Sequence, residues 1–406
     1  MRVLYVSQYF VSADQPGGVR HWMHTQALHR AGHKVSVVTS YVQHKERTIP
    51  ERYRGKKMVR ETQDGLEIWR TYSTPGYGRD LRSRLANYTS FATWASAAMM
   101  RVRKPDVIVA SSPSLPAATA AAMVARVRRV PFVMEARDLW SDSAKAMGLI
   151  TNPKVLGVAR RMERFCYSTA RHVIALTEGI REGIIAEGVD PAKVTLITNG
   201  IDLDVIGEAE PEPAEAPVPD DAFVAMYVGA HGTYSSLETV LGAAELLADR
   251  DDIRVVLVGG GDRKPALQEL ARQKNLRNVV FVDPVPKRDV PRWLARAQVC
   301  VLPYQALEFF GGALPNKAFD YLAAARPILV AAPEGELTRL IREVDAGVCV
   351  PPEDPRAMAD AIRELADDLG RGRAMGERGR AAALERFDRR ALAAHFVAIV
   401  EDAARG

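Results

Sequence analysis

Short runs of β-branched and aliphatic residues alternate with amphipathic segments of helical length along this sequence. The first run covers residues 3–6, and a helical pattern follows it at 18–31 and ends at Gly32. Strands buried on both faces read as continuous apolar runs, and regular strand–helix alternation is typical of parallel sheets. The pattern therefore predicts an α/β fold built from doubly wound sheets.

The same alternation recurs in both halves of the chain. The first half predicts strands at 3–6, 35–39, 66–70, 107–110, 132–136, 172–175 and 194–197. The second half predicts strands at 225–228, 255–258, 279–282, 299–302, 328–330 and 347–350, and helices at 237–248, 265–274, 290–297, 316–325, 336–343 and 355–368. We therefore expect two Rossmann-like domains that face each other across a cleft, with ligands at the carboxyl ends of the strands.

A length of 406 residues fits two domains, and a stretch at 208–221 rich in Pro, Ala and acidic residues cannot form a core. We predict an N-terminal domain at 1–205, a linker at 206–221 and a C-terminal domain at 222–385. The last helix, at about 386–406, is expected to pack back onto the first domain.

Charge is distributed unevenly between the halves. Residues 1–200 carry 30 Lys and Arg against 16 Asp and Glu, a net charge of +14, and the remaining 206 residues carry 25 against 34, a net charge of −9. The basic half could bind a phosphorylated substrate, anionic lipid or nucleic acid. An apolar fraction of 47% with 26% charged residues excludes a mainly disordered chain. Three scattered cysteines indicate neither a disulfide framework nor a zinc cluster, and favour a reducing cytoplasm.

No membrane-spanning helix is expected, because the uncharged stretch 107–125 is interrupted by serines and prolines. The first ten residues are also too short an apolar run for a signal sequence. The stretch 78–104 allows two interpretations. Leu85, Phe91, Trp94 and Met99 could enter a bilayer surface between basic ends, or the stretch could be an ordinary core helix.

Glycine-rich and charged motifs follow two strands of the first half. The string GGVRHW at 17–22 opens a helix, so Gly17 and Gly18 would let the backbone approach an anion, with Arg20 and His21 pointing into the cleft. A flexible loop with surface basic residues is the alternative. At 135–138, Glu135, Arg137 and Asp138 would lie at the mouth of a strand, where they bind a ligand or form a structural ion pair.

Two similar motifs follow strands of the second half. The string GGGDRKP at 259–265 places Gly259, Gly261 and Arg263 for phosphate binding. In FFGGALPNKAFDYL (309–322), Gly311 and Gly312 would form a tight turn and Asn316 would cap the following helix.

Lys317 and the free N–H groups at that helix start would then hold a diphosphate, and Asp320 would accept hydrogen bonds from a ribose. A capped helix with a solvated Lys and Asp is the alternative.

Other strings exclude several classes of enzyme. Neither a P-loop nor the HExxH, GxSxG or CxxC pattern occurs. The Asp-x-Asp pairs Asp202/Asp204 and Asp249/Asp251 lie at the linker start and at a helix end, so we expect structural roles and no metal.

Taken together, these stretches resemble the GT-B glycosyltransferases of family 4 over nearly the whole chain. The likeness rests on the glycine pair near the first helix, Gly32–His33, NGID at 199–202, the 259–265 loop and PNKAFDYLAAARPIL at 315–329. The stretch EARDLW, with SSPSLP before it, resembles the bacterial subgroup that builds surface polysaccharides, including proteins similar to aminosugar transferases.

The resemblance implies retaining transfer of an N-acetylhexosamine or related hexose from a UDP-sugar, without a metal or other cofactor. The donor would bind the C-terminal domain and a glycan, lipid-linked or small-molecule acceptor the N-terminal one. Nucleic acid is not expected as a partner, whereas contact with the inner face of the cytoplasmic membrane stays open. By the same resemblance, catalysis is assigned to Arg137, Asp138, Arg263 and Lys317. Donor binding is assigned to Gly17, Gly18, Gly229, Gly261, Val285, Gly311, Gly312, Leu314, Pro315, Asn316 and Asp320.

The sequence departs from the family pattern at several positions. Ala230 and Ser235 replace the usual Arg and Lys, Gly312 stands where many members have a Glu, and Arg137 replaces a frequent His. We therefore expect Arg137, Arg263 and Lys317 to supply the positive charge for the diphosphate.

Three alternative functions stay open. A nucleotide-sugar 2-epimerase would use Glu135 and Asp138 for proton transfer. A NAD-dependent oxidoreductase is disfavoured because the Gly-x-Gly-x-x-Gly spacing is missing. A catalytically lapsed nucleotide-sugar-binding partner protein is the third alternative.

Overall fold

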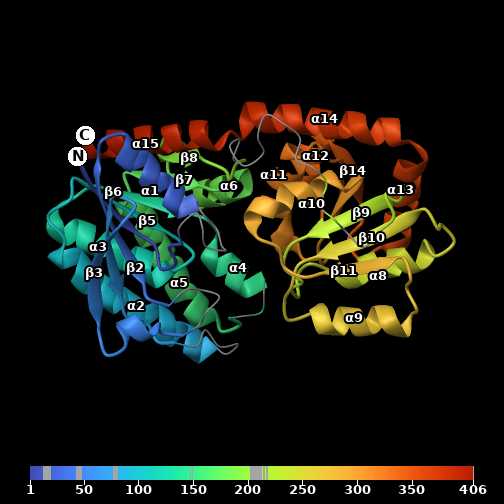
Figure 1. Cartoon of the computed structure of the whole chain (residues 1–406). Coiled ribbons are helices and arrows are strands. Elements are labelled where there is room, and N and C mark those ends of the chain that lie inside the picture. Colours follow the sequence, from blue (N-terminus) through green and yellow to red (C-terminus); the bar gives the residue numbers. More distant parts are fainter. Residues whose placement is uncertain are drawn as a thin grey trace. The chain divides into compact units, whose positions relative to one another are not determined.

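The chain forms two compact units, Met1–Thr198 together with Ala391–Gly406, and Asn199–Arg390. The computed structural model describes residues 1–11, 20–42, 48–75, 81–146, 148, 150–201, 213, 215 and 218–405. Gly17, Gly18, Asp202, Asp204 and most of the expected linker lie outside these residues. Each unit is built around one sheet with helices on both faces (Figure 1).

The N-terminal unit contains an eight-stranded sheet in the order β3-β4-β2-β1-β5-β6-β7-β8. All neighbouring strands are parallel except β3 and β4, which form an antiparallel pair. The strands are β1 (Arg2–Val6), β2 (Lys34–Ser40), β3 (Met58–Gln63), β4 (Leu66–Thr71), β5 (Val107–Ser111), β6 (Phe132–Ala136), β7 (His172–Ala175) and β8 (Val194–Leu196). The helices are α1 (Arg20–Arg30), α2 (Leu81–Arg101), α3 (Leu115–Arg128), α4 (Trp140–Ala146), α5 (Pro153–Thr169) and α6 (Glu178–Ala186).

The edge strand β3 was not predicted. Its sequence, MVRETQ, is mostly polar, and its side chains are half-buried or exposed, so it lacks the apolar run that marks the inner strands. Pairing with β4 through a turn at Asp64 and Gly65 makes it a strand, and both turn residues have positive φ.

The C-terminal unit contains a six-stranded parallel sheet in the order β11-β10-β9-β12-β13-β14. This is the Rossmann strand order: β10 and β11 are added on one side of β9, and β12, β13 and β14 follow on its other side. The strands are β9 (Phe223–Val228), β10 (Ile253–Val258), β11 (Val279–Val282), β12 (Val299–Pro303), β13 (Ile328–Ala331) and β14 (Gly347–Val350). The helices are α8 (Leu237–Leu246), α9 (Lys264–Gln273), α10 (Val290–Ala295), α11 (Asn316–Ala323), α12 (Glu336–Glu343), α13 (Pro355–Asp367) and α14 (Leu369–Arg386).

The last helix, α15 (Arg389–Arg405), packs on the N-terminal unit. Phe396 is fully buried there among residues of β1, β2 and β4, and its ring stacks on His24 with a centroid distance of 3.9 Å. The start and the end of the chain therefore share one hydrophobic core.

Two of the four residues suggested for a bilayer contact through α2 cannot make that contact. Phe91 and Met99 are fully buried in the core beneath α2 and α3, so neither can enter a membrane surface. Leu85 and Trp94 are half-buried, and Trp94 faces the ammonium group of Lys57. Within the described residues, no helix is both long and apolar enough to cross a membrane.

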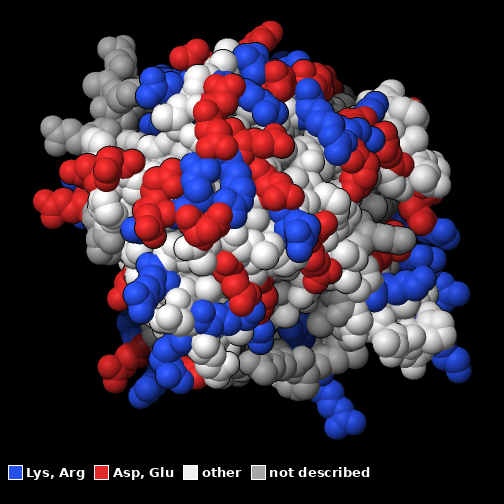
Figure 2. Space-filling model, turned by 90° about the vertical axis from the view of Figure 1, so that its right-hand side faces the viewer, with Lys and Arg blue, Asp and Glu red and all other residues white. Residues whose placement is uncertain are grey.

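Charged side chains on the C-terminal unit are extensively paired. Figure 2 shows acidic and basic side chains intermixed over the side on which α8, α9 and α13 lie in Figure 1. Arg363 donates two hydrogen bonds to Asp249, at 2.6 and 3.0 Å, and Arg250 joins Asp252 to Asp367. The structural role expected for Asp249 is therefore confirmed.

Candidate active site

Both sheets reverse strand order at one point, between β1 and β5 in the N-terminal unit and between β9 and β12 in the C-terminal unit. In open parallel sheets, the crevice at the carboxyl ends of such strands is the usual ligand site. The loops that follow β6, β9 and β10, together with the start of α11, carry most of the predicted site residues that the structure describes.

A buried ion pair organises the carboxyl edge of the N-terminal sheet. Glu135 of β6 is completely buried, and its Oε1 accepts a hydrogen bond from Nε of Arg20 at 2.7 Å. The two terminal nitrogens of Arg20 donate to the carbonyl oxygens of Ile197 and Thr198, at 2.7 and 2.6 Å. The guanidinium therefore ties the start of α1 to β6 and to the segment after β8.

This arrangement corrects one prediction. Arg20 and His21 were expected to point into a ligand cleft, but their side chains are only 9% and 6% exposed and turn toward Glu135. The cause is electrostatic, because an ionised carboxylate inside the unit needs a cation and hydrogen-bond donors around it.

A chain of hydrogen bonds connects Glu135 to Arg137. The Tyr5 hydroxyl donates to Oε2 of Glu135 at 3.0 Å, and Nδ1 of His21 lies 2.8 Å from the same hydroxyl oxygen. Nε2 of His21 lies 3.0 Å from Nη1 of Arg137. Because arginine can only donate, Nε2 accepts, so the ring proton sits on Nδ1 and is donated to Tyr5. Arg137 is thereby held through one neutral tautomer of His21.

The protonation states agree with this geometry. Burial, followed by the Arg137 guanidinium, lowers the pKa of His21 to about 3. Burial alone would raise the pKa of Glu135, but Arg20 foremost among its neighbours holds that pKa well below its usual range. Glu135 is therefore ionised and His21 neutral near pH 7.

Ser112, directly after β5, fixes the residues that follow β6. Its hydroxyl donates to Oδ1 of Asp138 at 2.9 Å and accepts the backbone N–H of Arg137 at 2.8 Å. Burial raises the pKa of Asp138, and the bond from Ser112 partly opposes that rise. Arg137 and Asp138 thus lie together at the carboxyl end of β6, beside the end of β5, in keeping with their predicted position after a strand.

In the C-terminal unit, Lys317 lies over the loop that follows β9. Gly229 has a φ of +157°, and a Cβ atom built there would lie 2.1 Å from Cε of Lys317. Only glycine therefore leaves room for this lysine. The ammonium group lies 5.3 Å from the ring centre of Tyr227, and no hydrogen bond or ion pair joins it to any other residue that the structure describes.

Neighbouring bonds keep the β9 loop in place beneath Lys317. The Tyr227 hydroxyl donates to the carbonyl oxygen of Ala230 at 2.8 Å and also lies 3.0 Å from the Ser235 hydroxyl. Ala230 and Ser235, which replace basic residues of the family pattern, thus contribute to loop structure and carry no charge.

The loop after β10 packs directly on the β9 loop. Gly261 has a φ of +154°, and a Cβ atom there would lie 2.5 Å from the carbonyl oxygen of His231. The ammonium group of Lys264 holds this loop in place by donating to the carbonyl oxygens of Gly259 and Val282 and to the carboxylate of Asp283. Arg263, predicted to bind phosphate, instead donates to Glu238 of α8.

Asp320, the predicted ribose ligand, is paired with a residue that the sequence did not single out. Its Oδ2 lies 2.5 Å from Nζ of Lys287, which precedes α10. Lys287 is remote in sequence and lies in no recognisable motif, so only the fold brings it to this position.

Asn316 does not cap α11, contrary to prediction. The helix begins at Asn316 itself, Pro315 occupies the capping position, and no side chain accepts a bond from the first turn. Proline fixes a suitable φ before the helix. The N–H of Ala318 donates to the carbonyl oxygen of Pro315, whereas the N–H groups of Asn316 and Lys317 have no acceptor among the described residues.

The remaining predicted donor-site residues lie near this helix start or close to Lys287. Gly311 and Gly312 end a short 3₁₀ helix, Gly311 packs against the backbone of Gly335, and Leu314 is buried in the core. Val285 is half-buried against the same core, two residues before Lys287.

Comparison with known proteins agrees with this geometry. Residues 17–200 match the glycosyl transferase 4-like domain, and residues 222–368 match the domain of glycosyl transferases group 1. WcaI of Escherichia coli (strain K12), a glycosyl transferase named for colanic acid biosynthesis, is 26% identical over 82% of this chain and 84% of its own length. The alpha-D-kanosaminyltransferase of Streptomyces kanamyceticus is 26% identical over 61% of this chain and 64% of its own.

Solved structures share the fold at low sequence identity. Sucrose-phosphate synthase from Thermosynechococcus elongatus superposes with a TM-score of 0.73 at 18% identity, covering 99% of this chain and 98% of its own. Anabaena Alr3699/HepE, solved with UDP, has a TM-score of 0.70 at 15% identity, covering 99% of this chain and all of its own.

Two Rossmann-like units, each with one switch point in its sheet, define the GT-B class of fold. The chain belongs to the family 4 glycosyltransferases, since its two halves match the two domains of that family.

The neutral, buried state of His21 predicts a specific pH dependence of stability. Unfolded His21 takes up a proton below about pH 6.5, whereas the folded residue stays neutral down to about pH 3. Protons therefore favour the unfolded state, and this residue should lower the free energy of unfolding by ~1.4 kcal/mol per pH unit below pH 6.5.

Urea unfolding of the wild type and His21→Gln between pH 7.5 and pH 4.5 tests this. The variant should lose stability less steeply by that amount, and the exposed His395→Gln control should follow the wild type. Equal slopes for wild type and His21→Gln would show that folding leaves the pKa of His21 unchanged, which contradicts a neutral buried ring.

Proposed function

We propose that this glycosyltransferase moves an N-acetylhexosamine or related hexose, with retention of anomeric configuration, from a UDP-sugar to a hydroxyl group. The acceptor would be a glycan, a lipid-linked sugar or a small molecule. The observation that carries the proposal is Lys317, whose ammonium group has no acceptor among the described residues and lies over Gly229. A partly buried cation beside a glycine loop suits a diphosphate.

In the proposed reaction, negative charge develops on the leaving diphosphate, and stabilising this charge is the main electrostatic requirement. The bond between the anomeric carbon and the diphosphate oxygen breaks, and the acceptor oxygen forms its new bond on the same face. The acceptor proton passes to the leaving phosphate oxygen, so UDP leaves as the protonated product. Lys317 and the free N–H groups at the start of α11 would stabilise the negative charge that develops.

We propose that this charge is supplied without a metal or other cofactor. Arg263 would have to leave Glu238 to reach a phosphate, so its part is secondary to that of Lys317. Asp320 would bind ribose hydroxyls through the oxygen that Lys287 does not occupy, or after Lys287 turns away.

The N-terminal unit would hold the acceptor near Arg137 and Asp138. Only one oxygen of Asp138 is engaged by Ser112, which leaves the other to accept a hydrogen bond from a sugar hydroxyl. Arg137, anchored through His21, would add positive charge at a fixed position.

Printed names of similar proteins support the choice of donor and acceptor. HepE has been solved with UDP and with UDP-glucose, the kanosaminyltransferase is named for an amino sugar, and WcaI for colanic acid biosynthesis. A 2-epimerase is not favoured, because both halves match transferase domains. The fold resemblance to a UDP-N-acetylglucosamine 2-epimerase, at 15% identity, concerns architecture only.

We place the reaction in the cytoplasm, in keeping with three free cysteines, two of them buried. Contact with a membrane surface would rest on the exposed Arg101 and Lys104 at the end of α2, since the apolar residues first considered are buried or half-buried.

Product analysis tests the proposed reaction. The protein incubated with UDP-N-acetylglucosamine or another α-linked UDP-sugar and a panel of sugar acceptors should release UDP and form an α-linked product. Proton NMR of the anomeric signal distinguishes the configurations. A β-linked product would contradict retention, and epimerisation of the donor without an acceptor would contradict transfer.

Replacing Lys317 by Ala should lower the rate of transfer by about tenfold or more, because the variant lacks one positive charge that stabilises the leaving diphosphate. Lys274→Ala is the matched control, since Lys274 pairs with Glu245 on the surface and should be dispensable. Comparison of kcat/KM with any active donor measures both. An unchanged rate for Lys317→Ala would overturn the assignment of Lys317, and tight UDP binding without turnover in the wild type would favour a lapsed partner protein.

A further inference from the structure

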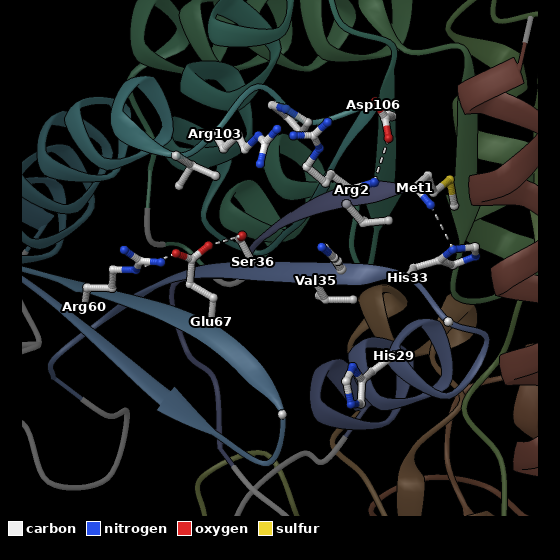
Figure 3. A pocket seen from close by; sticks show the side chains of 16 residues that line it. Met1, Arg2, His29, His33, Val35, Ser36, Arg60, Glu67, Arg103 and Asp106 are labelled. Carbon is white, nitrogen blue, oxygen red and sulfur yellow. Dashed lines mark hydrogen bonds and ion pairs between the residues drawn. The ribbon is translucent and has the colours of Figure 1, made fainter.

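A pocket of about 590 Å³ lies at the amino ends of the strands in the N-terminal unit, at the edge of the sheet opposite to Arg137 and Asp138. Its walls come from the starts of β1 and β2, the connection from α2 to β5 and the β3–β4 hairpin, as Figure 3 shows. Small-molecule sites commonly have volumes of roughly 300–1,000 Å³. This pocket is therefore large enough for a ligand and separate from the proposed active site.

Three cations in the pocket have no acidic partner. The guanidinium groups of Arg2 and Arg103 and the ammonium group of Lys34 take part in no hydrogen bond or ion pair with any residue that the structure describes. Arg103 and Lys34 are exposed, and Arg2 is half-buried. These side chains come from three separate segments, and the fold alone brings them to one pocket.

The two acids of the pocket are already engaged. Glu67 pairs with Arg60 at 2.5 Å and accepts the hydroxyl of Ser36, and Figure 3 shows this group on one wall. Asp106 accepts the backbone N–H of Arg2 at 2.6 Å, which holds the start of β1 beside the start of β5. The lining carries four basic side chains, Arg2, Lys34, Arg60 and Arg103, against these two carboxylates, so an excess of positive charge remains in the pocket.

Several arginines elsewhere on the surface are paired. On the C-terminal unit, arginines such as Arg250, Arg363 and Arg378 each donate to a carboxylate. Three unpaired cations around one concave site repel one another unless an anion binds among them. Arg and Lys together suit phosphate, because arginine offers paired donors and lysine a point charge.

The lining also indicates which phosphates fit. Val3, Val35 and Val102 form apolar parts of the wall, and none of the described lining residues is Phe, Tyr or Trp. The phosphates of a sugar phosphate, a polyphosphate or a lipid headgroup need only cations, which the basic side chains of the pocket offer.

We propose that this pocket binds a phosphate-bearing anion through Arg2, Lys34 and Arg103. The anion is either a free metabolite or the headgroup of a lipid. Because the pocket lies at the amino ends of the strands, its ligand binds without competing with UDP.

Calorimetry with the full chain and inorganic tripolyphosphate tests the free anion, and sedimentation with phosphatidylcholine vesicles with or without phosphatidylglycerol tests the lipid. The wild type should bind at least one of the two, and saturating UDP should leave the affinity unchanged. In Lys34→Glu/Arg103→Glu, binding should weaken by about tenfold or more, since two charged contacts are lost.

The matched control is Lys154→Glu/Arg161→Glu, which makes the same charge change at exposed positions of α5. This control should keep its affinity. Lys34→Gln/Arg103→Gln repeats the test should the charge reversal impair folding, which thermal unfolding would show. Loss in the pocket variants with tripolyphosphate assigns a free anion, and loss with vesicles alone assigns a lipid. Absence of binding by the wild type, equal weakening in the control, or displacement by UDP would overturn the proposal.

Discussion

The ion pair between Arg20 and Glu135 determines how the carboxyl edge of the N-terminal sheet is built. Both charges lie in the interior, so a substitution that removes one of them would destabilise the fold by about 3–5 kcal/mol. The pair also joins α1, β6 and the segment after β8. A buried pair of this kind adds little net stability over apolar residues of equal size. Its consequence is positional, because Tyr5 donates to Glu135 and accepts from His21, and His21 in turn fixes Arg137 at the strand end.

The C-terminal unit shows the opposite arrangement, since the ammonium group of Lys317 has no acceptor among the described residues. Gly229 has no side chain that would clash with Lys317 over the β9 loop, and the ammonium group of Lys317 lies over the ring of Tyr227. Positive charge that the unit does not neutralise is available to a ligand, and preorganised charge is an effective means of stabilising a leaving diphosphate. The N-terminal unit therefore pairs the buried charge of Glu135, while the C-terminal unit leaves the charge of Lys317 without an acceptor among the described residues.

The order of strands and helices was largely predictable from the sequence, because buried parallel strands are continuous apolar runs. The polar edge strand β3 escaped detection since its residues carry no such run. Lys317, Gly229 and Asp138 were predicted as site residues because each follows a strand or opens a helix. The inward direction of Arg20, the Lys287–Asp320 pair and the amino-end pocket could not be predicted, because each depends on residues distant in sequence that only the folded chain brings together.

The central claim is that Lys317 and the start of α11 bind the donor diphosphate without a metal. Titration of the full chain with UDP, followed by thermal unfolding in the presence of a chelator and then of Mg²⁺, tests it most directly. The account predicts equal stabilisation in both conditions, of about 2.7 kcal/mol when UDP is a hundredfold above its Kd, and weaker binding by Lys317→Ala. Stabilisation that appears only with Mg²⁺, or UDP binding that Lys317→Ala leaves unchanged, would contradict it.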